Sequence, residues 1–100
     1  GYRVELGEIE ATLRKFSDKE FVAVISIHGS GGEVLYLPAF IEGLSSDAEK
    51  LMRAESAKVL PNYMMPRYIF SIDAMPLNSN GKVDYAELGR IHERRLEVGI

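Results

Sequence analysis

The chain has 100 residues, a formal net charge of −3 and no cysteine. This length predicts one domain, covering residues 1–100, that can bury a core without metals or disulfides. The lack of cysteine excludes disulfides and zinc–thiolate sites, and the lack of a basic stripe argues against nucleic-acid binding. No apolar run approaches the roughly 18 residues of a membrane span and no signal segment is present, so we expect a cytoplasmic protein.

The chain opens with a pattern that changes from extended to helical. Residues 1–5 alternate between apolar and polar side chains, which predicts a short extended segment. The apolar residues of the next stretch recur at helical spacing and predict a core-packing helix over residues 6–16, with Glu10 on its water-facing side. The residues on its apolar face are Leu6, Ile9, Leu13 and Phe16.

Two strands are expected next. The β-branched and aromatic run at residues 21–27 predicts a central strand. A glycine-rich turn at residues 29–32 connects it to a return strand within residues 34–41. Because Pro38 removes one backbone donor from that return strand, we place it at a sheet edge or give it a bulge.

The second half of the chain predicts a helix, a strand and a last helix. Ser46 and Glu49 form a capping box that opens a helix ending at Leu60. A strand follows at residues 68–72, and the last helix starts at about Tyr85. The residues expected on the apolar sides of the two helices are Ala48, Leu51, Met52, Val59 and Leu60, then Leu88, Ile91 and Leu96.

This order of elements predicts an α+β fold. We expect a small, mostly antiparallel three-stranded sheet covered by about three helices, with a short N-terminal extended segment. A helical crossover after the hairpin would place the third strand beside the first and antiparallel to it. Between Pro61 and Pro66, the residues Tyr63, Met64 and Met65 predict a rigid loop that either closes the core or offers a docking surface.

The richest chemical signal is the loop at residues 76–84. Its two asparagines, serine and glycine tolerate the tight backbone conformations of a turn, and Asp84 is placed to cap the helix that follows. Lys82 is therefore presented between a turn and a helix start, as a compact charge suited to phosphate oxygens. The alternative is an ordinary surface turn with a solvated lysine.

Other chemistries fit the residues poorly. A phosphate-binding P-loop would need a glycine where Pro76 stands and a hydroxyl where Val83 stands, and a calcium-binding EF-hand would need a carboxylate at Pro76. His28 and His92 have no second histidine nearby in sequence, so structural roles are expected for both. No serine lies in a nucleophile-elbow pattern.

Three motifs together carry a family resemblance. They are GYRVELGEIE at residues 1–10, LPNYMMP at 60–66 and NGKVD at 80–84. In this order and spacing they resemble the C-terminal subdomain of adenylate-forming (AMP-binding) enzymes of the amino-acid adenylation branch. That branch includes adenylation domains of nonribosomal peptide synthetases and D-alanine–carrier protein ligases. Because the chain begins at Gly1 rather than at a methionine, we expect a piece of a longer protein.

The resemblance implies a two-step ligase that is inactive as this fragment alone. ATP activates an amino acid or related carboxylic acid as an acyl-adenylate, and the phosphopantetheine thiol of a carrier protein then takes the acyl group. Lys82 matches the family's catalytic lysine, and Gly1, Tyr2 and Arg3 match a loop that lines the pantetheine tunnel. ATP and Mg²⁺ would be bound mostly by an N-terminal adenylation domain, whose hinge to this subdomain lies upstream.

Two alternatives stay open. The subdomain of an acyl-CoA synthetase is related, although the sequence at residues 80–84 favours the carrier-protein branch; Tyr85, where many peptide synthetases carry arginine, leaves the subgroup open. A non-catalytic interaction module would instead use the loop at residues 63–65 and the hairpin edge. In an isolated structure we expect Lys82 to be exposed and loosely held.

Overall fold

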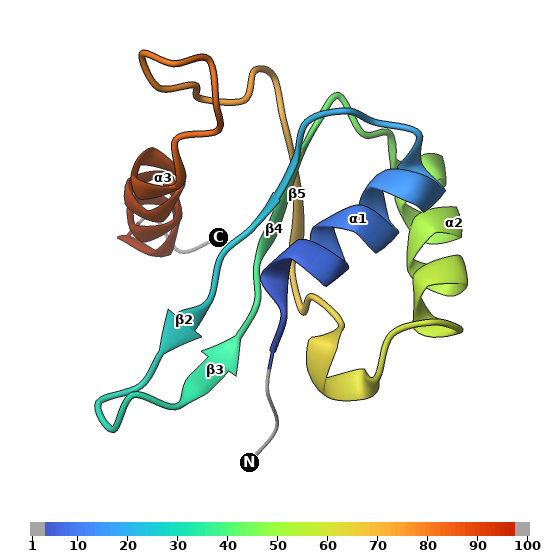
Figure 1. The fold of residues 1–100 in the computed structure, drawn as a ribbon, viewed down its shortest axis with the longest axis horizontal. Coiled ribbons are helices and arrows are strands. Elements are labelled where there is room, and N and C mark those ends of the chain that lie inside the picture. Colours follow the sequence, from blue (N-terminus) through green and yellow to red (C-terminus); the bar gives the residue numbers. More distant parts are fainter. Residues whose placement is uncertain (1–3, 98–100) are drawn as a thin grey trace.

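The computed structural model describes residues 4–97. The helices are α1 (Leu6–Ser17), α2 (Ser46–Ala57), the 3₁₀ helix η1 (Asn62–Met64) and α3 (Tyr85–Glu97). The strands are β1 (Val22–Val24), β2 (Ile27–His28), β3 (Val34–Tyr36), β4 (Ala39–Glu42) and β5 (Ile69–Ile72). The predicted α+β class is confirmed: small, mostly antiparallel sheets are covered by three α-helices (Figure 1).

Strand β4 is the centre of the three-stranded sheet. It pairs antiparallel with β1, opposing Phe40 and Ala23, and parallel with β5, opposing Phe40 and Phe70. Strands β2 and β3 form a separate hairpin that extends away from this sheet (Figure 1). Helices α1 and α2 lie on one side of the sheet and α3 lies on the other (Figure 1).

Each face of the sheet has its own core. Successive side chains of a strand point to opposite faces, so Ala39 and Ile41 of β4 face one way and Phe40 faces the other. Ala39 and Ile41 pack with α1 and with Met52 of α2. Phe40 packs with Leu88 of α3. Strand β4 therefore holds both helical layers in place.

The strand order differs from the sequence expectation. The run at residues 21–27 is not one central strand, because it divides into β1 at the sheet edge and β2 in the hairpin. The return strand also divides, into β3 of the hairpin and β4, and β4 is central instead of peripheral. Pro38 precedes β4, so its missing donor leaves the β4 ladder intact. The register irregularity lies in β2, between Ile27 and His28, and not in the return strand. Strand β5 is antiparallel to β1 as expected, but it lies beside β4 and not beside β1. It is parallel to β4, because α2 carries the chain back to the end of the sheet where β4 began.

The helices agree more closely with the sequence, with errors at their ends. Helix α1 is confirmed to within one residue. Helix α2 is capped by Ser45, whose Oγ accepts a hydrogen bond from the Ala48 N–H at 3.2 Å, and not by Ser46 as expected. It also ends at Ala57 and not at Leu60. Of the residues expected on its apolar side, Met52 and Leu60 are buried and Ala48 packs against the core, but Leu51 and Val59 are exposed.

Helix α3 packs on the sheet through Leu88, Ile91 and His92, while Leu96, expected to face inward, is exposed. The His92 side chain is buried, and its Nε2 shares a hydrogen bond of 2.8 Å with the Tyr36 hydroxyl of β3. Among residues 4–97, the buried Nδ1 of His92 has no hydrogen-bond partner. Burial, and then the charge of Arg95, lowers the pKa of His92 below its ordinary value.

Replacing Met52 by alanine should lower the free energy of unfolding by about 2–5 kcal/mol, because this side chain is fully buried between α2 and the sheet. Its neighbour Leu51 is 61% exposed, so Leu51→Ala is the matched control and should change stability by less than about 0.5 kcal/mol. Urea unfolding of the 100-residue chain measures both values. Equal losses would contradict the assignment of the buried face of α2.

The lowered pKa of His92 predicts a loss of stability in mild acid. The unfolded chain binds the proton at the ordinary pKa of 6.5 more readily than the folded chain, so this stability is present above pH 6.5 and is lost as the pH falls. His92→Gln should remove this part of the pH dependence, whereas replacing the exposed His28 by glutamine should keep it. Urea unfolding midpoints, measured between pH 8 and pH 5 at roughly three pH values per pH unit, test this.

Candidate functional site

The candidate site is the Lys82 loop, which we define as residues 76–84. It is closed like a small hairpin by an antiparallel bridge between Leu77 and Val83. Inside that bridge the Asn78 N–H donates to the Lys82 carbonyl at 2.7 Å, and outside it the Asp84 N–H donates to the Pro76 carbonyl at 2.9 Å. These two hydrogen bonds form the bridge and fix the two arms of the loop against each other.

The tip of the loop is organised by Asn78. Its Oδ1 accepts hydrogen bonds from the backbone N–H of Asn80, at 2.8 Å, and of Lys82, at 3.2 Å. Its carbonyl accepts from the Gly81 N–H at 3.0 Å, which closes a turn. Gly81 has φ +78°, a left-handed conformation that side chains disfavour. The turn chemistry expected from the sequence is present, with Asn78 as its centre.

The Lys82 side chain is exposed, as expected. Among residues 4–97 its ammonium group makes no hydrogen bond or ion pair, but its backbone is bonded to Asn78 through both N–H and carbonyl. The side chain is therefore loosely held, as expected, while the backbone is held by the turn that the sequence predicts. The loop presents a cation that is free to reach an anionic group outside this subdomain.

The base of the loop is anchored at the sheet. The Met75 N–H donates to Oε2 of Glu42, at the end of β4, at 2.6 Å, and the Met75 side chain is buried. On the other side of the loop, Asp84 caps α3 as predicted, accepting from the Glu87 N–H at 3.0 Å. The Glu87 carboxylate does not return to Asp84 as in a capping box; it bonds Arg90, which lowers the pKa of Glu87.

A second carboxylate, Glu10 of α1, lies beside the start of α3. The Tyr85 hydroxyl donates to Glu10 Oε2 at 2.7 Å, and the same oxygen accepts from the Val24 N–H of β1 at 2.9 Å. Burial, and then the hydrogen bond to Glu10, raises the pKa of Tyr85 to about 12. The expectation that Glu10 only faces water is wrong, because β1 is an edge strand whose free N–H binds this carboxylate.

Sequence reasoning missed the contacts of Glu42 and Glu10. Glu42 follows a buried strand and precedes Gly43, which marks a strand end, but nothing in the sequence pairs it with Met75. Glu10 has the spacing of a surface residue. Both partnerships join residues far apart in the chain, so local pattern could not reveal them.

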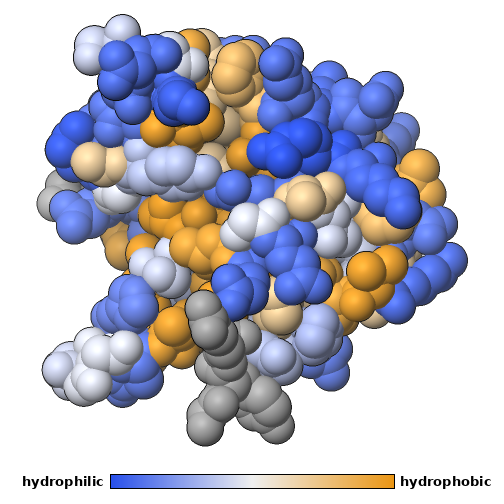
Figure 2. All heavy atoms as spheres, in the orientation of Figure 1, coloured by the Kyte–Doolittle hydropathy of each residue, from blue (hydrophilic) through white to orange (hydrophobic). Residues whose placement is uncertain are grey.

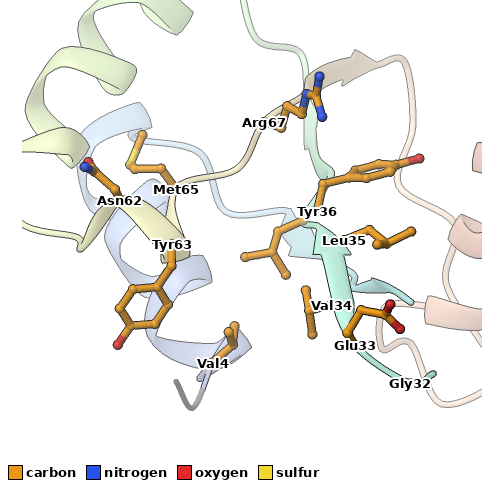
Figure 3. Close-up of a pocket in the computed structure, with 11 residues that line it drawn as sticks. Val4, Gly32, Glu33, Val34, Leu35, Tyr36, Asn62, Tyr63, Met65 and Arg67 are labelled. Carbon is orange, nitrogen blue, oxygen red and sulfur yellow. The ribbon is translucent and has the colours of Figure 1, made fainter. Parts of the chain in front are cut away.

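Gly1, Tyr2 and Arg3, the other expected site residues, lie outside the described residues. Val4, the next residue in the sequence, lines a cleft of about 650 Å³ between the β2–β3 hairpin and the loop around η1 (Figure 3). Tyr63, Val34 and Arg67 also line it. Figure 2 shows hydrophobic residues exposed near the middle of the face that is seen in Figure 1, with hydrophilic residues around them.

The η1 loop is mainly a packing element. Met64 is buried in the core shared by α1, α2 and the sheet, and Met65 packs against that core. Tyr63 is 42% exposed, so it is the large hydrophobic residue that this motif places at the surface. Among residues 4–97 no group of three or more histidine or acidic side chains could hold a metal ion. No helix of the described residues is long and apolar enough to cross a membrane.

The curated proteins similar in sequence include several long synthases. Tyrocidine synthase 2 of Brevibacillus parabrevis is 40% identical over 84 residues, which is 84% of this chain and 2% of that protein. Phenyloxazoline synthase MbtB of Mycobacterium tuberculosis is 35% identical over 97 residues, which is 97% of this chain and 7% of that protein. The chain thus spans a small fraction of the length of these relatives. No protein-family profile matches it.

Solved structures share the fold at lower sequence identity. The anthranilate CoA ligase AuaEII, in complex with anthranoyl-AMP, matches with a TM-score of 0.78 and 20% identity, over 94% of this chain and 18% of that one. The Vibrio cholerae adenylation domain AlmE, in complex with glycyl-adenosine-5'-phosphate, matches with a TM-score of 0.74 and 21% identity, over 93% of this chain and 17% of that one. Sequence and fold agree with the three motifs: the chain belongs to the adenylate-forming (AMP-binding) enzyme family, as a C-terminal subdomain of its amino-acid adenylation branch.

Proposed function

We propose that this chain is the mobile C-terminal lid of an ATP-dependent ligase. The full enzyme activates an amino acid or related carboxylic acid as an acyl-adenylate and passes it to the phosphopantetheine thiol of a carrier protein in the cytoplasm. The observation that carries this proposal is the Lys82 loop, a rigid backbone that presents a cation without a partner among residues 4–97. The 100-residue fragment alone is expected to be inactive.

Lys82 is the proposed catalytic residue of the first step. When the carboxylate attacks the α-phosphate of ATP, negative charge builds on the phosphorus centre and on the attacking oxygens. A cation held at that place stabilises the transition state more than the ground state. The closed loop supports this role, because its hydrogen bonds fix the Lys82 backbone before the substrate arrives.

The second step is proposed to use the other end of the subdomain. Gly1, Tyr2 and Arg3 would line the path of the pantetheine arm after the lid rotates and withdraws Lys82. Phosphopantetheine and the carrier protein are the partners of that step. ATP and Mg²⁺ would be held mostly by the N-terminal adenylation domain.

A carrier protein is the preferred acceptor over coenzyme A. The curated relatives of 40% and 35% identity are tyrocidine synthase 2 and phenyloxazoline synthase MbtB, and neither is a CoA ligase by name, whereas the solved CoA ligase has 20% identity and shares the fold alone. The full enzyme should therefore load its acid onto a holo carrier protein at least about tenfold faster than onto coenzyme A. Mass spectrometry of the two thioesters measures the ratio. Faster loading of coenzyme A would assign the subdomain to an acyl-CoA synthetase.

Replacing Lys82 by alanine in the full enzyme should slow adenylation by about 10²–10³-fold, because a charge contact made to the transition state is lost. Carboxylate-dependent exchange of labelled pyrophosphate into ATP measures this step. Transfer of a supplied acyl-adenylate to the carrier protein should change much less, since Lys82 is withdrawn in that step.

Lys50→Ala is the matched control, because Lys50 is an exposed lysine on α2, away from the loop. It should leave both half-reactions within about twofold of the unmodified enzyme. An equal loss of adenylation and transfer in Lys82→Ala would contradict the role proposed for this residue. Unchanged adenylation would contradict the proposed function itself and favour an interaction module.

A further inference from the structure

One oxygen atom connects three separate parts of the fold. Glu10 Oε2 of α1 accepts hydrogen bonds from the Tyr85 hydroxyl, at the start of α3, and from the Val24 N–H of β1. Both donors follow Glu10 in the sequence, Val24 by 14 residues and Tyr85 by 75. Helices α1 and α3 lie on different sides of the sheet, so this contact joins the two layers at the sheet edge (Figure 1).

The position of Tyr85 gives this contact its consequence. Tyr85 is the first residue of α3, and Asp84 directly before it closes the Lys82 loop by donating to the Pro76 carbonyl. Any rotation of the first turn of α3 would therefore move the closed loop as a unit. The loop hydrogen bonds fix its shape, but they do not fix its direction relative to the sheet.

The other contacts of the outgoing arm of the loop constrain its direction less. Leu88 and Val83 pack in the apolar cluster around Phe40, and apolar packing is non-directional. The Met75–Glu42 hydrogen bond holds the incoming arm of the loop. On the outgoing arm, the Tyr85 hydroxyl supplies a directional, charge-assisted hydrogen bond to another element.

We propose that Tyr85 and Glu10 are positioning residues for Lys82, aiming the loop cation at the reacting carboxylate and phosphate. This inference rests on the proposed adenylation function. Neither residue contacts substrate in this assignment, and both act through the direction of the first turn of α3. The Val24 N–H completes the arrangement, because it holds the Glu10 carboxylate in place on the sheet edge.

The test is Tyr85→Phe in the full enzyme, which removes the hydroxyl and keeps the ring. Adenylation, measured by pyrophosphate exchange, should fall roughly tenfold, because small displacements of a catalytic group are costly. Transfer of a supplied acyl-adenylate should stay within about twofold. Tyr68→Phe is the matched control, since Tyr68 is also part exposed and makes its contacts to Tyr36 and Phe70 through its ring.

Two further variants separate positioning from general stability. Glu10→Gln keeps an oxygen that can accept both hydrogen bonds and should retain adenylation, whereas Glu10→Ala should reproduce the loss of Tyr85→Phe. In a Lys82→Ala background, Tyr85→Phe should cause no further loss, because a residue that acts through Lys82 has nothing left to position.

The outcomes are distinct. Full adenylation by Tyr85→Phe, or an additive loss in the Lys82→Ala background, would overturn the positioning role while leaving the proposed function standing. Unchanged adenylation in Lys82→Ala alone would overturn the proposed function and this inference with it. The expected result is that Tyr85→Phe slows adenylation and Glu10→Gln does not. In the Lys82→Ala background, Tyr85→Phe then causes no further loss.

Discussion

Strand β4 is the constraint on which the rest of the structure depends. It is paired on both edges and buried on both faces, so its four residues fix the position of β1, of β5 and of both helical layers. A strand in this position must be almost wholly apolar until it ends, and Glu42 marks that end. The first carboxylate after the buried segment then holds Met75 and with it one arm of the Lys82 loop.

The loop itself combines a rigid backbone with a free side chain. Asn78 satisfies four backbone groups that would otherwise need water, namely the N–H groups of Asn80, Gly81 and Lys82 and the Lys82 carbonyl. Gly81 takes the left-handed conformation that closes the turn. The Lys82 side chain keeps most of its conformational freedom, while its backbone is fixed. A cation of this kind suits a partner that arrives from outside the subdomain, as the proposed N-terminal domain would bring it.

Side chains on α1 also bind backbone groups along the edge strand β1. Besides Glu10, Arg14 donates to the carbonyls of Glu20, at 3.1 Å, and of Val22, at 3.4 Å. Covering the outer backbone groups of β1 protects an edge strand from pairing with another chain. Helix α1 begins within the N-terminal motif at residues 1–10. One stretch of sequence therefore supplies both the contacts to the sheet edge and the proposed contact to Tyr85 of α3.

The sequence by itself determined the fold class, the helices and the turn at Lys82. These features depend on local patterns: the apolar spacing of α1, the asparagine and glycine of the turn, and the cap at Asp84. Its three motifs also determined the family, because motif order is a property of the sequence. The helix ends were less secure, since Ser45 and Ser46 are equally good caps and only the backbone angles at Ser45 select it.

The tertiary structure decided the strand order and the partners of the isolated carboxylates. Whether β5 lies beside β1 or β4 depends on how α2 packs, and the energy of that packing is spread over many distant contacts. The burial of His92 and the exposure of Leu96 depend likewise on the angle at which α3 meets the sheet. Glu10 has the spacing of a solvent-facing helical residue, and only the approach of β1 and Tyr85 makes it a structural contact.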